Sequence, residues 1–542
     1  MRYFKSIVMI AASLFILTSC ESEDKFLEEN PSDFLTTENA YLNKAQFELA
    51  IAGMHDQMQE FFNSSDGDVD TWMLGLGTDV CFWPMDDSRI YNDWTLVNEF
   101  HWYSGQWYDR QYKIINLANN VIDNAKNEEV KWNSDEEKNA IVAEARFFRA
   151  FAYRNLVNIF GGVPLVKESI TSAKLDFVRA TKEACNQFAK EDLEFASSHL
   201  PITASQPGRV VRAAADHLLS EINISLNDYD GAIAAASRVI NGTDGNYKLM
   251  NARFGSRMNE TDKGKDVYWD LFRMGNQNYD TGNTESIWTT QYEFNTPGGV
   301  PRYSRTLIER TMWPRHWLFA KAGYNGVAVD STGRGVSFVR PTDYSNYTIW
   351  KNSGNDIRNK EINIKRKFYF ADDVPPYSKG DVIPKSFLTA REDTLQYIYP
   401  AWAKFGTDKH LDNGRPGFYI RDFYVMRLSE TYLLRAEAYL GKGELQKAAD
   451  DINIVRARAQ APLIGAADVT LDYILDERAR ELFGEEFRQL TLGRLGLRVQ
   501  RTQQYGYPPA ALSITARNDL FPIPQTVIDR NTEAVIEQNP GY

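Results

Sequence analysis

Apolar residues recur every three or four positions over a long segment near residue 150, and this spacing constrains the fold most. They are Ile141, Ala145, Phe148, Ala152, Leu156 and Ile159. Such a period places all of them on one face of an α-helix. Ser134 and Glu137 precede the run as a capping box, S-x-x-E, and Gly161-Gly162 with Pro164 follow it. The sequence therefore predicts one long helix that ends near residue 160.

Further segments read as pairs of helices joined by tight turns. The segment 219–240 breaks at Asn227-Asp228, the segment 427–459 breaks at Gly441 and Gly443, and 180–201 resembles a second helix of such a pair. Small residues follow the turns where two helices would approach closely: Ala232, Ala235, Ala236, Ala448 and Ala449. This pattern predicts tetratricopeptide-like helix pairs. Alanine-rich helices without a repeat architecture are the alternative.

A segment of different composition interrupts the helices. Residues 242–420 are rich in Gly, Asn, Pro and aromatic residues, with short strand-like runs such as 285–294. We expect a mainly α fold with a loop-rich insertion that carries short strands, and binding residues are often found on such loops. The predicted organisation is a signal peptide (1–19), a tether (20–37), a helical region (38–241), the insertion (242–420) and a second helical region (421–542).

The N-terminus has the layout of a secretory signal peptide. Arg2 and Lys5 precede an apolar run, Ile7 to Leu17, that is too short to span a bilayer. Leu17-Thr18-Ser19-Cys20 resembles a bacterial lipobox, which implies that Cys20 is lipidated and becomes the first mature residue. Acyl chains on one cysteine can anchor a protein without a transmembrane helix. A helix packed in the core is the alternative.

Charge and cysteine content exclude several classes of protein. The formal net charge of −12 becomes −14 once Arg2 and Lys5 leave with the signal peptide. Such an acidic chain is a poor nucleic-acid binder, because phosphate contacts need clustered Lys and Arg. After Cys20 only Cys81 and Cys185 remain. Their spacing gives neither a disulfide framework nor a zinc site, although one disulfide is compatible with it.

Catalytic and cofactor motifs are missing from the sequence. It contains no H-E-x-x-H, G-x-S-x-G, phosphate-binding loop or G-x-G-x-x-G, and its six histidines are scattered. Asp66, Asp68 and Asp70 resemble the start of a calcium loop, but Thr71 replaces the expected glycine and Gly77 the closing glutamate. A plain acidic turn is the alternative. We expect no cofactor; a glycosidase carboxylate pair is neither indicated nor excluded.

Four stretches together resemble the SusD/RagB family, the surface glycan-binding lipoproteins of Bacteroidetes. They are 143–166, 427–444, 474–496 and 520–542, and "RPTD" (340–343) and "NDIR" (355–358) also fit. Glu21, Glu23 and Asp24 resemble the acidic export signal of such lipoproteins. The resemblance implies non-catalytic capture of an oligo- or polysaccharide at the outer surface of the outer membrane. It also implies a partner, a TonB-dependent SusC-like transporter that takes the glycan inward.

Two segments carry loop aromatics among polar residues, as sugar recognition requires. Sugar rings lie against flat aromatic side chains, and their hydroxyls need Asn, Asp, Gln or Arg nearby. In 77–102 and 295–317 the candidates are Asp79, Trp83, Arg89, Tyr91, Trp94, Tyr303, Trp313, Arg315 and Trp317. The family's glycan-contacting aromatics come from these two general regions. Trp83 and Trp313 each precede a proline, which favours an extended backbone, so we expect them to be displayed.

Other family segments are expected to be scaffold. Trp102 and Trp107 belong to or adjoin the helix predicted for 107–123, and we expect them in the core. In 474–496, alternating Glu and Arg residues are spaced for ion pairs along one helix, while Arg488 and Arg494 can reach neighbouring helices. Pro522 and Pro524 predict an extended tail. Two functional alternatives remain: a surface glycoside hydrolase, and a transporter-associated subunit without a glycan site.

Overall fold

The computed structural model describes residues 40–59, 61, 71–90, 92–260, 264–293, 296, 308–329, 332–407 and 420–542. Several predictions therefore lie outside the described residues. They concern the signal peptide, Cys20, the tether, Tyr91, Tyr303 and the calcium candidates Asp66, Asp68 and Asp70. In the part that is described, no helix is long and apolar enough to cross a membrane.

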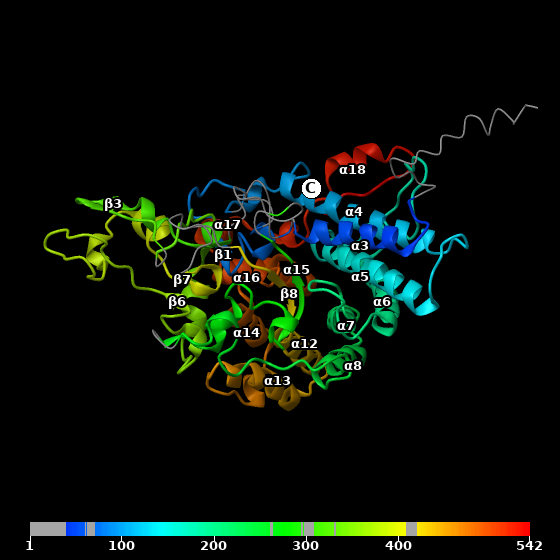
Figure 1. The fold of residues 1–542 in the computed structure, drawn as a ribbon. Coiled ribbons are helices and arrows are strands. Elements are labelled where there is room, and N and C mark those ends of the chain that lie inside the picture. The colour runs from blue at the N-terminus through cyan, green and yellow to red at the C-terminus, as the bar shows by residue number, and fades with distance from the viewer. Residues whose placement is uncertain are drawn as a thin grey trace, which may run out of the picture.

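A continuous stack of helices forms the body of the protein (Figure 1). Each helix packs on the next in the order α3 (Lys44–Gln59), α4 (Trp102–Asn124), α5 (Asp135–Phe160), α6 (Lys182–His199), α7 (Arg212–Ser225), α8 (Tyr229–Ile240), α12 (Leu428–Gly441) and α13 (Leu445–Arg458). The insertion separates α8 from α12 in sequence, yet these two helices are neighbours in space. The predicted helix pairs and the mainly helical fold class are confirmed.

Local signals account for the ends and the close packing of these helices. The Ser134 hydroxyl accepts a hydrogen bond from the Glu137 N–H and begins α5, whereas the Glu137 carboxylate reaches the N–H of Asn133 instead of Ser134. The five predicted alanines are fully buried. At the end of α12, a Cβ on Gly441 would lie 2.5 Å from the Tyr229 ring. A side chain at this position would displace the Tyr229 ring, so glycine favours the close approach of α12 to the start of α8.

The insertion consists of loops, short strands and short helices, as predicted. In the described part of the chain its strands form antiparallel two-stranded pairs, two of them with strands outside the insertion, β1 and β8. The pairs are β1 (Cys81–Phe82) with β5 (Arg340–Pro341), β2 (Ser286–Thr290) with β8 (Phe423–Arg427), β3 (Ala320–Lys321) with β4 (Tyr324–Asn325), and β6 (Ile364–Lys365) with β7 (Ala401–Trp402). The short helices are α9 (Val267–Leu271), α10 (Ile308–Met312) and α11 (Asp343–Asn346). Strand β3 lies at the left end of Figure 1, far from α7 and α8.

The segment 474–496 is two helices and not one. Helix α14 (Leu471–Leu482) ends before Gly484, whose φ of +71° suits glycine, and α15 (Arg488–Leu495) begins after it. Arg480 pairs with Glu477 inside α14. Most of the charged side chains of α14, however, pair with residues on other elements, which corrects the prediction of ion pairs along one helix. Arg488 and Arg494 do reach carboxylates elsewhere, Asp79 and Glu437.

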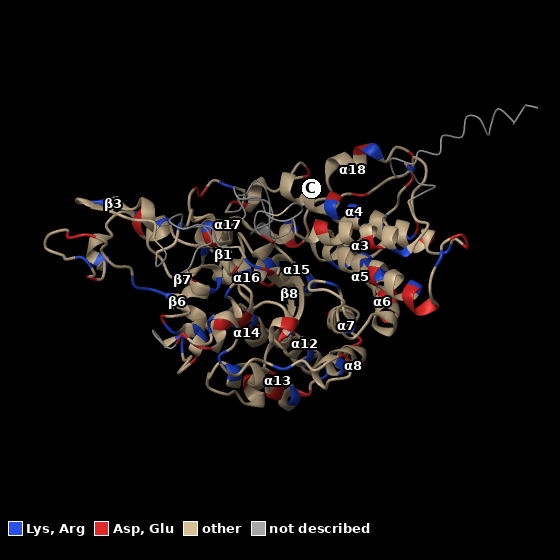
Figure 2. Cartoon of the chain, in the orientation of Figure 1, with Lys and Arg blue, Asp and Glu red and all other residues tan. Residues whose placement is uncertain are grey.

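Buried ion pairs join the insertion to the C-terminal helices. Glu481 of α14 lies 3.0 Å from Arg358 and 2.9 Å from Arg427, and it also pairs with Arg458. All four side chains are buried. Over the rest of the described chain, basic and acidic residues are interspersed along helices and loops (Figure 2). The charges thus serve the packing of the core as well as the surface.

The C-terminal segment closes the body. It follows α16 (Arg498–Tyr505) and α17 (Pro508–Ser513), and α18 (Gln525–Arg530) lies near its end. Phe521 donates its N–H to the Ile159 carbonyl, and Gln525 donates to that of Glu99. Residues 521–524 between them are extended and buried, as predicted from the two prolines. Cys81 and Cys185 are buried free thiols, so the optional disulfide does not form.

Candidate functional site

The structure brings the two predicted segments together. Strand β1 pairs with β5, with Phe82 opposite Arg340, so that residues 83–89 lie beside the 335–340 loop. The Arg315 side chain contacts Met85 Sδ at 3.3 Å, and its backbone N–H donates to the Gln396 carbonyl at 2.9 Å. Gln396 in turn donates to the Pro84 carbonyl at 3.4 Å. Gln396 therefore connects the segment 77–102 with the segment 295–317.

Trp83 lies inside this junction and is only 3 % exposed. Its ring stacks on Phe338 with centroids 5.0 Å apart and an interplanar angle of 15°, and the Arg89 guanidinium lies 5.8 Å from its centroid. The ring of Trp83 turns inward, because Phe338 covers it. The expectation that Trp83 is displayed is wrong.

Trp313 and Trp94 are also framework residues. Trp313 is 5 % exposed, and its indole N–H donates to the Trp402 carbonyl at 3.1 Å. Trp94 is 3 % exposed and donates to the Gly77 carbonyl at 2.9 Å. The expected display of Trp313 is therefore wrong as well. A proline fixes the backbone of the preceding residue but not the side on which its neighbours pack.

Asp79 is fully buried and pairs with two arginines. Its Oδ2 atom lies 2.6 Å from Arg488 Nη2 and 3.1 Å from Arg501 Nε. Burial alone would raise the pKa of Asp79, but the two guanidiniums outweigh burial and lower it below its usual range. Asp79 thus holds α15 and α16 against the β1 segment, and it is not exposed to a ligand.

Of the candidate residues that the structure describes, three remain accessible. Arg89 is exposed, and Arg315 and Trp317 are half-buried. The Trp317 indole N–H donates to the Gly335 carbonyl at 2.8 Å, and the Arg334 guanidinium lies 4.9 Å from the ring centroid. These contacts fix the orientation of Trp317 before any ligand arrives.

Near Arg89 in the chain, Asp87 forms an exposed ion pair whose partner, Arg391, sequence reasoning missed. Asp87 Oδ2 lies 2.7 Å from the exposed Arg391, and the Tyr507 hydroxyl donates to Asp87 Oδ1 at 2.8 Å. Tyr507 also stacks flat on Phe82, with centroids 3.9 Å apart. Burial and the Asp87 carboxylate raise the pKa of Tyr507 to about 12, so its phenol stays a neutral donor. Tyr507 precedes Pro508 in "YGYPP", just as Trp83 precedes Pro84. A search for aromatic residues that precede a proline would therefore have found Tyr507.

We name these accessible residues the Trp317 face. Its members are Asp87, Arg89, Arg315, Trp317, Arg334, Arg391 and Tyr507. The face combines fixed aromatic rings with guanidinium donors and one carboxylate acceptor. This combination suits a ligand that has apolar C–H faces and many hydroxyls.

Two other predictions concern α4, which begins beyond this face. Trp107 is 1 % exposed and belongs to the core, as predicted. Trp102 is 49 % exposed, so its predicted core position is wrong. Trp102 is the first residue of α4, so no preceding turn of the helix covers its side chain. Among the described residues, no group of three or more His, Cys, Asp or Glu side chains could hold a metal ion.

Comparisons with known proteins give matches to both halves of the chain. A model of the SusD family matches residues 268–542, and a model described as "Starch-binding associating with outer membrane" matches residues 25–224. A SusD-like protein, P2, of Formosa agariphila is 26 % identical over 550 residues, which cover 98 % of each chain.

Solved structures share the fold. A laminarin-binding SusD-like protein has a TM-score of 0.68 at 24 % identity, covering 93 % of this chain and 100 % of the other. Surface glycan-binding protein A of Bacteroides thetaiotaomicron, solved with laminarihexaose, has a TM-score of 0.64 at 20 % identity. That alignment covers 92 % of this chain and 99 % of the other.

Proposed function

The chain belongs to the SusD family, and from this premise we propose that it binds an oligo- or polysaccharide at the outer membrane without cleaving it. The observation that carries the proposal is the match of both halves of the chain to models of this family. The full-length likeness to the laminarin-binding SusD-like protein agrees with it.

The proposal includes an anchor and a partner. Cys20 carries the lipid that holds the protein at the extracellular side of the outer membrane, since a lipidated cysteine needs no spanning helix. The captured glycan passes to a SusC-like, TonB-dependent transporter. The sequence supports the anchor through its lipobox, and family membership supports the transporter.

We place glycan capture on the Trp317 face. The Trp317 ring offers a flat apolar surface, and its hydrogen bond to Gly335 restricts its motion. Little conformational entropy is then lost when a sugar stacks on it. Arg89 and Arg391 are exposed donors for sugar hydroxyls, and Asp87 is an acceptor. Trp83 and Trp313 support this face from beneath.

Native gels that contain a panel of plant, microbial and host glycans test the proposal. The mature chain without its lipid (residues 21–542) should be retarded by a glycan, and Trp317→Ala or Arg89→Ala should reduce the retardation. Trp102→Ala is the matched control, because it removes an exposed indole outside the Trp317 face. Retardation that survives the first two substitutions would move the site elsewhere.

Two further outcomes would contradict capture without cleavage. Release of reducing sugar that one Asp or Glu substitution abolishes would identify a hydrolase. Retardation by no glycan in the panel, with a folded protein, would leave a transporter subunit that lacks its own glycan site.

A further inference from the structure

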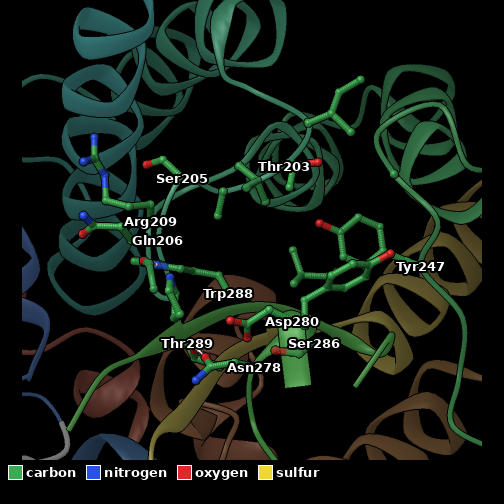
Figure 3. A pocket seen from close by; sticks show the side chains of 18 of the residues that line it. Thr203, Ser205, Gln206, Arg209, Tyr247, Asn278, Asp280, Ser286, Trp288 and Thr289 are labelled. Carbon is green, nitrogen blue, oxygen red and sulfur yellow. Dashed lines mark hydrogen bonds between the residues drawn. The ribbon is translucent and has the colours of Figure 1, made fainter. Parts of the chain in front are cut away.

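A hollow with a volume of about 410 Å³ lies between the helical stack and the insertion (Figure 3). Four segments surround it: the α6–α7 loop (202–211), the turn after α8 (245–247), residues 278–280, and strand β2. It shares no residue with the Trp317 face. Its size is at the lower end of the range for small-molecule sites, which suits one or two sugar units better than a long chain.

Aromatic rings form part of its wall and are fixed in place. Tyr247 and Tyr279 meet edge to face, with centroids 5.3 Å apart and an interplanar angle of 63°. Tyr279 is 40 % exposed, and its hydroxyl donates to the Asn246 carbonyl at 3.1 Å. Below them, the Trp288 indole N–H donates to the Gly208 carbonyl at 2.8 Å. The hollow thus offers ordered apolar surface to a ligand.

Polar side chains that are free to bind a ligand line the same hollow. Thr203, Ser205, Gln206 and Asp280 are exposed and belong to its lining. In the described part of the chain, none of these four side chains has a hydrogen-bond partner. Burial raises the pKa of Tyr247, so its phenol remains a neutral donor. Donors, acceptors and aromatic rings therefore line the same hollow.

The charge of the hollow selects against anions. Among the described lining residues Arg209 alone is basic, and its guanidinium points away from the space (Figure 3). It is bound to the carboxylates of Glu144 and Glu48 on the helices behind. Asp280 adds a negative charge to the lining. A carboxylate or sulfate on a ligand would have no counter-charge there, and it would lose water without compensation.

We infer that this hollow, the Tyr279 pocket, is a second carbohydrate site that binds one or two units of an uncharged oligosaccharide. The inference rests on the proposed function for the class of ligand, but its location and its preference for neutral sugars come from the pocket itself. Rings would contact the sugar faces, and Thr203, Gln206 and Asp280 would bind hydroxyls.

Hydrogen–deuterium exchange measured by mass spectrometry tests the inference, because it locates binding on the chain. Residues 21–542 are mixed with laminarihexaose or maltohexaose as neutral probes, and with a hexagalacturonate as the anionic probe. We expect one of the neutral probes to slow exchange in residues 203–209 and 278–280. The anionic probe should not do so.

Matched variants separate ligand contact from folding. Tyr279→Ala should lower the affinity with which the neutral probe slows exchange in the pocket segments by about tenfold. Tyr279→Phe keeps the ring and should retain most of this affinity. The double variant Thr203→Ala, Gln206→Ala removes two exposed polar groups and no packed ring. It should weaken the same effect, and an unchanged effect would contradict the assigned contacts.

The outcomes distinguish the two proposals. Slowed exchange in 83–89 and 315–338 alone would support the proposed function and overturn the Tyr279 pocket. Slowed exchange in the pocket segments alone would support the pocket and move the main site away from Trp317. If neither neutral probe slows exchange in either region, the Tyr279 pocket is overturned. The proposed function is overturned separately, by the absence of retardation with every glycan of the panel in native gels.

Discussion

Asp79 connects residues that lie far apart in the sequence, since its partners Arg488 and Arg501 belong to α15 and α16. Removing one member of a buried ion pair leaves the other charge without compensation. Single buried residues of this kind hold together the elements that carry the Trp317 face. Its accessible members, such as Arg89 and Trp317, then determine what the face can bind.

Asp79→Ala should lower the free energy of unfolding by about 1–3 kcal/mol, because it leaves buried guanidinium donors without an acceptor. Glu486 still pairs with Arg488, and Asp472 and Asp476 still pair with Arg501, so neither charge is left wholly uncompensated. Denaturant unfolding followed by circular dichroism measures this loss. Asp372→Ala, at an exposed position, is the control and should leave the unfolding midpoint unchanged. An Asp79→Ala protein as stable as the wild type would show that Asp79 is not a framework residue.

Asp244 should make stability fall as the pH rises. It is fully buried beside Asp216, which pairs with Arg238, and Arg212 is the other nearby cation. Burial and the Asp216 carboxylate raise the pKa of Asp244 to about 8. Between its unfolded pKa near 4 and this value, the folded state holds a proton that the unfolded state has lost, so stability decreases over that range.

The substitution Asp244→Asn tests this dependence. A neutral amide cannot ionise, so the variant should unfold at a higher temperature than the wild type near pH 8, and the two should converge near pH 4. Thermal unfolding at several pH values measures the difference. A wild-type minus variant difference that does not change with pH would contradict the shifted pKa.

At the scale of the elements, α5 and α15 touch at a glycine. A Cβ added to Gly493 would lie 1.9 Å from the Asn158 carbonyl oxygen of α5. Because this neighbour is backbone, it cannot turn aside, and one helix would have to shift. The contact holds the C-terminal family segment 474–496 on the long helix that the sequence predicted first.

Gly493→Ala should therefore destabilise the fold by about 1–3 kcal/mol, the usual cost of overpacking. Gly105→Ala in α4 is the matched control, since nothing lies within 4 Å of its added Cβ. It should be neutral or stabilise by up to about 1 kcal/mol, because alanine favours a helix. Urea unfolding compares the two, and equal effects would rule out the close contact between α5 and α15.

Sequence patterns predicted the elements better than the side chains of the site. The apolar period of α5 and the alanines of α8 and α13 are local signals, and the helices formed where they indicated. Trp83 and Trp313 are covered by Phe338 and by the segment near Trp402. Those partners lie far away in the sequence, so no local pattern could show that the rings turn inward.

For the whole molecule, buried carboxylates should make the fold sensitive to acid. Burial alone would raise the pKa of Glu477, but Arg358, Arg480 and Arg456 lower it to about 2. Surrounding arginines also lower the pKa values of Glu481 and Glu430. A lowered folded pKa gives stability that is present above the unfolded pKa, near 4.5, and is lost as the pH falls further.

The free energy of unfolding should thus fall steeply between about pH 4.5 and pH 2. Added salt should change this fall little, since buried pairs are poorly screened. Urea unfolding at stepped pH, with and without salt, measures both effects. A stability that stays constant down to pH 2 would mean that the ion pairs between insertion and C-terminal helices do not hold the fold together.

The central claim is that the Trp317 face captures a glycan, and isothermal titration tests it most directly. The glycan that retards the wild-type protein most is titrated into wild type, Trp317→Ala and Trp317→Phe. We predict an affinity about tenfold lower for Trp317→Ala and a smaller loss for Trp317→Phe, which keeps a flat ring. Equal affinities for wild type and Trp317→Ala, with equal unfolding midpoints, would contradict the claim.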